Sequence, residues 1–183
     1  MLTDSPAQGN AGTVRGVPRL IVLNGPPGIG KSTLAQRYVD DHPLALCLDL
    51  DPIRGQLGQW RSDETRSGEL ARDLSVAMIR THLDNGYDVV VPQFVARPAY
   101  LDRLRELGSV EVLLTASLDE AQRRFAARDS GHGRVAREMV DAAGGYQGQY
   151  DELMAMYDDR AAIRVSSTDV ESTYAALLAA LPR

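Results

Sequence analysis

The sequence predicts an α/β fold, with a five-stranded, mostly parallel sheet and helices on both of its faces. Two observations support this class. Five short runs of almost entirely apolar residues recur along the 183-residue chain, as in strands buried on both faces. Segments with a helical spacing of apolar residues separate these runs, an alternation typical of parallel sheets. At this length we expect one domain.

The strands are predicted from short runs rich in leucine and β-branched residues. In chain order these runs occupy residues 19–23, 44–50, 88–93, 110–117 and 162–167. Residues 1–17, before the first run, are small, polar and aperiodic. They predict a flexible leader in front of a single domain over residues 18–183.

The helices are predicted from apolar spacing and from signals at their ends. Pro98 suits the first turn of a helix, Gly86 can adopt a left-handed conformation that ends one, and Asp169 can cap the last. The predicted helices cover residues 32–41, 64–85, 97–107, 118–129, 150–159 and 169–181. More helix is expected between the glycine-bearing segments 130–133 and 144–148.

Composition narrows the class of partner and the compartment. The formal net charge of −5 provides no general basic field, so a long nucleic acid is disfavoured, although a local basic groove is still compatible with it. Cys47 is the only cysteine, which fits a reducing compartment. No run approaches the roughly 20 apolar residues of a membrane span. We therefore expect a cytoplasmic protein without a membrane partner, and the sequence does not indicate its oligomeric state.

A glycine-rich motif carries the strongest functional signal. The segment "NGPPGIGKST", residues 24–33, lies between the first predicted strand and the first predicted helix and contains G-x-x-x-x-G-K-[ST]. Glycines allow backbone N–H groups to turn inward, and a helix N-terminus attracts anions, so such a loop holds phosphate. We predict a nucleoside triphosphate site made by Gly25, Gly28, Ile29, Gly30, Lys31, Ser32 and Thr33. Lys31 would contact the β- and γ-phosphates as a catalytic residue, and Ser32 would bind Mg²⁺.

Two carboxylates follow the second predicted strand. Alternation along a strand would point Asp49 and Asp51 to the same side, beyond the strand ends where ligands bind in open α/β sheets. A carboxylate there could accept the proton of a hydroxyl that attacks the γ-phosphate. Alternatively one of them, Asp49 more readily than Asp51, caps the following turn while Pro52 starts a helix.

These motifs together resemble a known group. "GPPGIGKST" followed by "DPIR" is similar to the 5′-hydroxyl polynucleotide kinases, and "VLNG" with the acid after the second strand resembles chloramphenicol phosphotransferase. Both are among the small P-loop kinases, which include AAA-type and zeta-toxin-like proteins. The resemblance spans residues 19–181 and implies a P-loop NTPase three-layer sandwich that uses ATP. It also implies that Asp51 is the general base and that Arg54 contacts the acceptor.

Arginines follow the fourth predicted strand. Arg124 and Arg128 lie four residues apart on one helix face, a spacing similar to the lid of P-loop kinases, here about residues 118–145. In that resemblance Arg124 binds nucleotide, Arg128 is catalytic at the transferring phosphate, and Arg134 is a secondary candidate. The adenine is then expected between Arg124 and the loop after the fifth strand. On spacing alone, a solvated basic helix face would be the better interpretation of these arginines.

The third predicted strand departs from the common pattern. It ends in Gln93, where P-loop enzymes often place an acid that orients the magnesium shell. The amide of Gln93 could instead bind the acceptor, and the nearby Arg97 could meet an anionic acceptor or lie on the rim. Which acid supports Mg²⁺ is left open between Asp49 and Asp51.

The sequence thus favours an ATP-dependent phosphotransferase acting on a hydroxyl of a small acceptor such as a sugar, nucleoside or antibiotic. A 5′-hydroxyl polynucleotide kinase is the nearest alternative, and a basic channel on the acceptor side would favour it. A nucleotide-dependent switch or regulatory ATP-binding module is the alternative from another class. No N-K-x-D tetrapeptide for guanine recognition is present.

Overall fold

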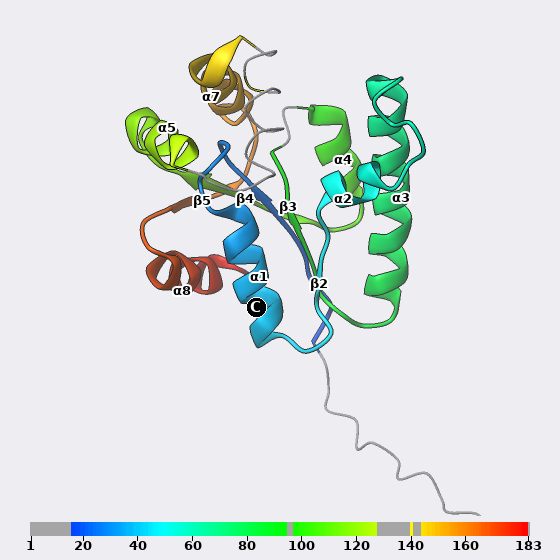
Figure 1. The fold of residues 1–183 in the computed structure, drawn as a ribbon. Coiled ribbons are helices and arrows are strands. Elements are labelled where there is room, and N and C mark those ends of the chain that lie inside the picture. Colours follow the sequence, from blue (N-terminus) through cyan, green and yellow to red (C-terminus); the bar gives the residue numbers. More distant parts are fainter. Residues whose placement is uncertain (1–15, 95–96, 128–139, 141–143, 183) are drawn as a thin grey trace, which may run out of the picture.

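Five apolar segments form a single parallel sheet in the computed structural model (Figure 1), which describes residues 16–94, 97–127, 140 and 144–182. The strand order is β2-β3-β1-β4-β5, and every pairing is parallel, as predicted. The strands are β1 Leu20–Asn24, β2 Leu46–Cys47, β3 Val89–Pro92, β4 Val110–Thr115 and β5 Ile163–Ser166.

Helices cover both faces of the sheet and complete the three-layer sandwich. Along β1, Ile21 and Leu23 enter one hydrophobic cluster, while Leu20 and Val22 enter the other. The first cluster is covered mainly by α1 and α8, and the second by α3 and α4, which lie on opposite sides of the sheet in Figure 1. The helices are α1 Lys31–Asp41, α2 Leu50–Gly55, α3 Glu64–Asp84, α4 Pro98–Glu106, α5 Leu118–Ala126, α7 Gly145–Met156 and α8 Val170–Ala180.

Two predicted elements differ from the structure. The strand expected over residues 44–50 is reduced to β2, because Leu44 has a left-handed backbone with φ of 66° and Asp49 already caps α2. The break expected over residues 144–148 is shorter, because α7 begins at Gly145. The cap predicted at Asp169 is confirmed, since its side chain accepts from the Ser172 N–H at 2.9 Å.

The parallel arrangement brings the carboxyl ends of the strands to one edge. Leu23 lies beside Pro92 in the β1–β3 pairing, and Thr115 lies beside Ser166 in the β4–β5 pairing. The segments that follow these strands therefore emerge together, and this edge holds the candidate site. Among the described residues, no helix combines the length and the apolar character required to cross a membrane.

Candidate nucleotide-binding and phosphoryl-transfer site

The glycine-rich loop runs from the end of β1 into α1. Gly30 caps α1 in a left-handed conformation with φ of 101°, and Gly28 has φ of 84°. A Cβ on Gly28 would lie 2.8 Å from both the Cα and the N of Phe125 in α5. Glycine at position 28 is thus required by the backbone conformation and by the close approach of α5. The loop, which we call the P-loop, joins the sheet edge to the helix N-terminus as predicted.

Lys31 lies inside this loop. Its Nζ donates to the carbonyl oxygens of Gly25 at 2.8 Å and Pro26 at 2.9 Å, and the side chain is buried. Ser32 and Thr33 follow in the first turn of α1 and are exposed. An ammonium, two hydroxyls and the positive end of a helix dipole are therefore gathered at one helix N-terminus, an arrangement suited to phosphate.

The same helix turn fits a magnesium ion. The described residues contain no group of three His, Cys, Asp or Glu side chains able to hold a metal. Mg²⁺ in nucleotide sites keeps several waters and binds phosphate oxygens with one or two protein ligands. The exposed Ser32 hydroxyl, beside a phosphate-binding loop, is a ligand of this kind. Bound there, the ion would neutralise phosphate charge.

Residues that the sequence analysis did not identify hold the P-loop in place. The Asn24 side chain is fully buried, accepts from the Gly25 N–H at 2.8 Å and donates to the Tyr157 hydroxyl at 3.0 Å. The Tyr146 hydroxyl of α7 donates to the Pro27 carbonyl at 2.7 Å. Burial raises the pKa of Tyr157 to about 12 and also raises the pKa of Tyr146, so both hydroxyls stay neutral at physiological pH. No local pattern could have revealed contacts between residues more than 100 positions apart.

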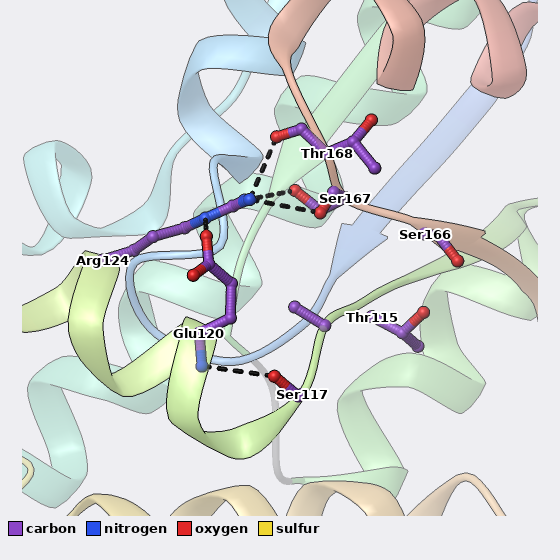
Figure 2. Close-up of a pocket in the computed structure, with 8 residues that line it drawn as sticks. Thr115, Ser117, Glu120, Arg124, Ser166, Ser167 and Thr168 are labelled. Atoms are coloured by element: carbon purple, nitrogen blue, oxygen red, sulfur yellow. Dashed lines mark hydrogen bonds and ion pairs between the residues drawn. The ribbon is translucent and has the colours of Figure 1, made fainter.

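An open pocket of about 590 Å³ lies beside the P-loop, between the start of α5 and the segment after β5 (Figure 2). Its lining is mostly small and polar. The lining residues are Thr115, Ala116, Ser117, Glu120, Arg124, Ser166, Ser167 and Thr168. This is the position expected from the resemblance for the nucleotide base, between Arg124 and the loop after the fifth strand.

Arg124 joins the two walls of this pocket, as Figure 2 shows. Its guanidinium donates to the Glu120 carboxylate at 2.6 Å, the Ser167 hydroxyl at 3.0 Å and the Thr168 carbonyl at 3.1 Å. Arg123 also pairs with Glu120, and the two arginines lower the pKa of that carboxyl. Arg124 is thus held in a fixed position on the wall of the pocket.

The other predicted lid arginines, Arg128 and Arg134, lie outside the described residues, as does most of the segment between α5 and α7. The predicted catalytic role of Arg128 and the lid over residues 118–145 therefore stay predictions.

Four residues were predicted on the acceptor side. Three of them, Asp49, Asp51 and Gln93, lie together. The Asp49 side chain caps α2 by accepting from the Asp51 N–H at 3.0 Å, the alternative role considered for Asp49. Gln93 accepts from the Leu50 N–H through Oε1 at 3.5 Å, which brings the end of β3 against the start of α2. Asp51 is exposed in the first turn of α2.

Arg54 has a different environment. Its guanidinium donates to the Ser67 hydroxyl at 3.1 Å and to the Glu64 carbonyl at 2.8 Å, and it stacks over the Trp60 ring at 4.7 Å. Arg61 lies over the same ring at 4.2 Å. Arg54 therefore joins α2 to the start of α3 in this structure.

Comparisons with known proteins agree with this fold. Residues 20–147 match the model of the family AAA_33, described as an AAA domain. A sugar kinase from Janibacter sp. HTCC2649 is similar with a TM-score of 0.60 and 17% identity, over 89% of this chain and 94% of that chain. A gluconokinase from Sinorhizobium meliloti 1021 is similar with a TM-score of 0.52 and 19% identity, over 90% and 94%.

A third structure, APE1195, has a TM-score of 0.58 and 19% identity, over 88% of this chain and 93% of that chain. No curated protein matches the chain. At these identities the solved structures establish the fold alone, and the closer resemblance to polynucleotide kinases and chloramphenicol phosphotransferase stays a prediction. The family match spans most of the chain, and the P-loop described above lies within it. The chain therefore belongs to the AAA domain family AAA_33, with the fold of the P-loop kinases.

Proposed function

We propose that this protein is a phosphotransferase that moves the γ-phosphate of ATP, bound with Mg²⁺, to a hydroxyl of a small acceptor. One observation carries the proposal. The P-loop leaves β1 directly beside the end of β3, where Gln93 and the start of α2 with Asp51 lie. A phosphate donor site and a carboxylate therefore share one sheet edge, as phosphoryl transfer to a hydroxyl requires.

The nucleotide would occupy the P-loop and the pocket beside it. The triphosphate would lie on Gly25, Gly28, Ile29 and Gly30, and the base would lie against Arg124 in the pocket of Figure 2. Lys31 would exchange its two carbonyl contacts for phosphate oxygens, which form stronger, charge-assisted hydrogen bonds. Ser32 would bind the Mg²⁺, which neutralises charge on the phosphates when present.

In the transfer step, the acceptor oxygen forms a bond to the γ-phosphorus while the bond from this phosphorus to the β–γ bridging oxygen breaks, releasing ADP. The hydroxyl proton passes to Asp51. We take Asp51 and not Asp49 as the base because the Asp49 carboxylate caps α2, whereas Asp51 is exposed in the first turn of that helix. Arg128 would neutralise charge on the equatorial oxygens in the transition state, and Gln93 would hydrogen-bond the acceptor.

A small acceptor is favoured over a long nucleic acid. The net charge of −5 opposes binding of a polyanion. Of the arginines that could line a basic channel, Arg54 is paired with Glu64 at 3.6 Å and Arg66 with Glu69 at 3.2 Å. Two of the similar structures are titled a sugar kinase and a gluconokinase, which is consistent with a small acceptor.

The test is ADP release from ATP and Mg²⁺ with a panel of sugars, nucleosides, aminoglycosides, chloramphenicol-like compounds and a 5′-hydroxyl oligonucleotide. We expect an acceptor-stimulated rate that falls at least about 100-fold in Asp51→Asn, the usual size of a general-base contribution. Asp84→Asn, an exposed aspartate at the far end of α3, is the matched control and should keep the wild-type rate. Slow ATP hydrolysis that ignores every acceptor and Asp51 would instead support a nucleotide-dependent switch.

A further inference from the structure

Two arginines lie together where α3 and α4 approach the candidate site. The two helices contact each other through Ser75 and Tyr100, whose hydroxyls are 2.7 Å apart. Arg72 and Arg97 each precede a member of this pair by three residues, almost one helical turn. Both helices start at the sheet edge that holds the P-loop (Figure 1), so the arginines lie on the site side of the Ser75–Tyr100 contact.

The Arg72 side chain extends toward the start of α3. Its Nη1 lies 3.4 Å from the position that a Cβ on Gly68 would occupy, one turn closer to the sheet edge. Gly68 follows Ser67, whose hydroxyl accepts from Arg54 of α2. The guanidinium of Arg72 is therefore directed along α3 toward its N-terminal turns, the part of the helix that contacts α2.

No described carboxylate forms an ion pair within 4.0 Å with either arginine. Glu69 attracts Arg72 only at longer range, and the neighbouring acids have other partners. Glu69 pairs with Arg66 at 3.2 Å, and Asp73 pairs with Arg103 at 2.9 Å. Burial, followed by repulsion from Arg97, lowers the pKa of Arg72, as expected for a partly buried cation beside a like charge.

We propose that Arg72 and Arg97 form an anion subsite for the acceptor, which therefore carries a carboxylate or phosphate group in addition to its reactive hydroxyl. This inference rests on the proposed function. Two like charges without an ion-paired acid repel each other in the free protein, and an oxyanion between them would remove that repulsion. Guanidinium groups bind planar carboxylates and phosphates through paired hydrogen bonds, which gives orientation as well as affinity.

The position of the pair fits an acceptor that reaches across the sheet edge. Arg97 stands at the N-cap position of α4 and follows Gln93 by four residues, so the proposed hydroxyl site and the proposed anion subsite both follow the end of β3. In a protein of net charge −5, local cations are also needed to attract an anionic substrate.

The experiment compares acceptors that differ in charge. Steady-state phosphorylation is measured with gluconate against glucose, glycerate against glycerol, and adenosine 3′-monophosphate against adenosine, with a 5′-hydroxyl oligonucleotide as a separate arm. Arg72→Gln and Arg97→Gln are the test variants, and Arg97→Lys retains charge without the paired geometry. Arg80→Gln is the matched control, because Arg80 is an exposed arginine two turns further along α3. Thermal melting verifies that each variant is folded.

We expect the wild type to prefer the anionic member of at least one pair. Arg72→Gln and Arg97→Gln should raise its KM about ten- to a hundredfold, with a small effect on kcat and on the neutral member. Arg97→Lys should be intermediate and Arg80→Gln unchanged. A second readout is calorimetric binding of gluconate to the protein loaded with Mg²⁺ and a non-hydrolysable ATP analogue, which should weaken equally in the two test variants.

Three outcomes would overturn the inference. If neutral and anionic acceptors are phosphorylated with equal efficiency and neither variant changes this, the anion subsite is rejected. The proposed function is not affected by that result. A preference for the oligonucleotide over every small anion would reject a small acceptor. ADP release that no acceptor stimulates, with no gluconate binding, would reject the proposed function and this inference with it.

Discussion

The Ser167 hydroxyl donates a 2.9 Å hydrogen bond to the carbonyl oxygen of Ile29, which connects the segment after β5 to the P-loop. The same hydroxyl accepts from Arg124 at 3.0 Å, so one side chain connects the P-loop to Arg124 in the pocket proposed to hold the nucleotide. We predict that Ser167→Ala weakens binding of an ATP analogue about three- to tenfold by calorimetry, the effect of losing such hydrogen bonds. Ser172→Ala, an exposed serine in α8, is the control. Unchanged affinity in Ser167→Ala would refute this role.

The approach of α5 to the P-loop makes a prediction about stability. Gly28→Ala combines a left-handed φ of 84° with atoms 2.8 Å from the new Cβ, and should lower the free energy of unfolding by about 2–4 kcal/mol. Gly30→Ala also has a positive φ, 101°, but no atom within 4 Å of its Cβ, and should cost only about 1–2 kcal/mol. Urea unfolding followed by Trp60 fluorescence measures both. Equal losses would show that contact with Phe125 contributes nothing.

Tyr157 should give the protein a specific loss of stability at high pH. Its folded pKa of about 12 exceeds the unfolded value of 10.0, so the folded state favours the neutral phenol. This contribution is complete below pH 10 and is lost as the pH rises toward 12. The Tyr157→Phe variant lacks the phenol, so only the wild type loses this contribution. The difference in free energy of unfolding between wild type and variant should therefore decrease by about 2 kcal/mol between pH 9 and pH 12. Urea titrations across this range test the effect, and a constant deficit would contradict it.

A buried ion pair in β4 should affect stability without affecting the site. The Glu111 carboxylate is almost fully buried and contacts Arg160 at 2.6 Å and Arg105 at 2.9 Å. We predict that Glu111→Gln lowers the free energy of unfolding by about 3 kcal/mol, because the largely buried Arg160 loses its buried counter-ion and keeps only the exposed Asp102, at 2.8 Å. Arg105→Gln removes a partner that is 47% exposed and should cost less than about 1 kcal/mol. Nucleotide affinity, measured by calorimetry, should be unchanged in both variants, since Glu111 lies near the opposite end of β4.

Much of the fold could be predicted because its elements carry local signals. The glycine-rich motif, the apolar strands and the cap at Asp169 each depend on residues close together in the chain. The segment after Pro43 was harder because its apolar residues suit a strand by composition. In the structure the left-handed backbone at Leu44 and the capping by Asp49 limit β2 to two residues. Helix α2 has only six residues, too few to show a period.

The site was predictable where a motif exists and not where contacts are distant. Lys31 and Ser32 could be named from the glycine-rich motif and Arg124 from the resemblance to a kinase lid, and their roles stay predictions. In the structure Lys31 contacts the carbonyls of the glycine-rich loop, and Arg124 lies on a pocket wall. Asn24, Tyr146 and Tyr157 could not, because their hydrogen bonds join segments separated by more than 100 residues. The orientation of Arg54 toward Ser67 likewise depends on how α2 packs against α3.

The strand order has a consequence for how such a protein can change during evolution. Because β1 is central, the elements from β2 to α4 lie on one flank of the P-loop and the elements from β4 to α8 on the other. Each flank is one uninterrupted stretch of chain. Recombination at two positions, before β2 and after α4, would therefore exchange the whole proposed acceptor side and retain the proposed nucleotide pocket. Leu153 and Tyr157 of the retained part pack in the cluster with α3 and α4, and a transplanted segment would have to match them.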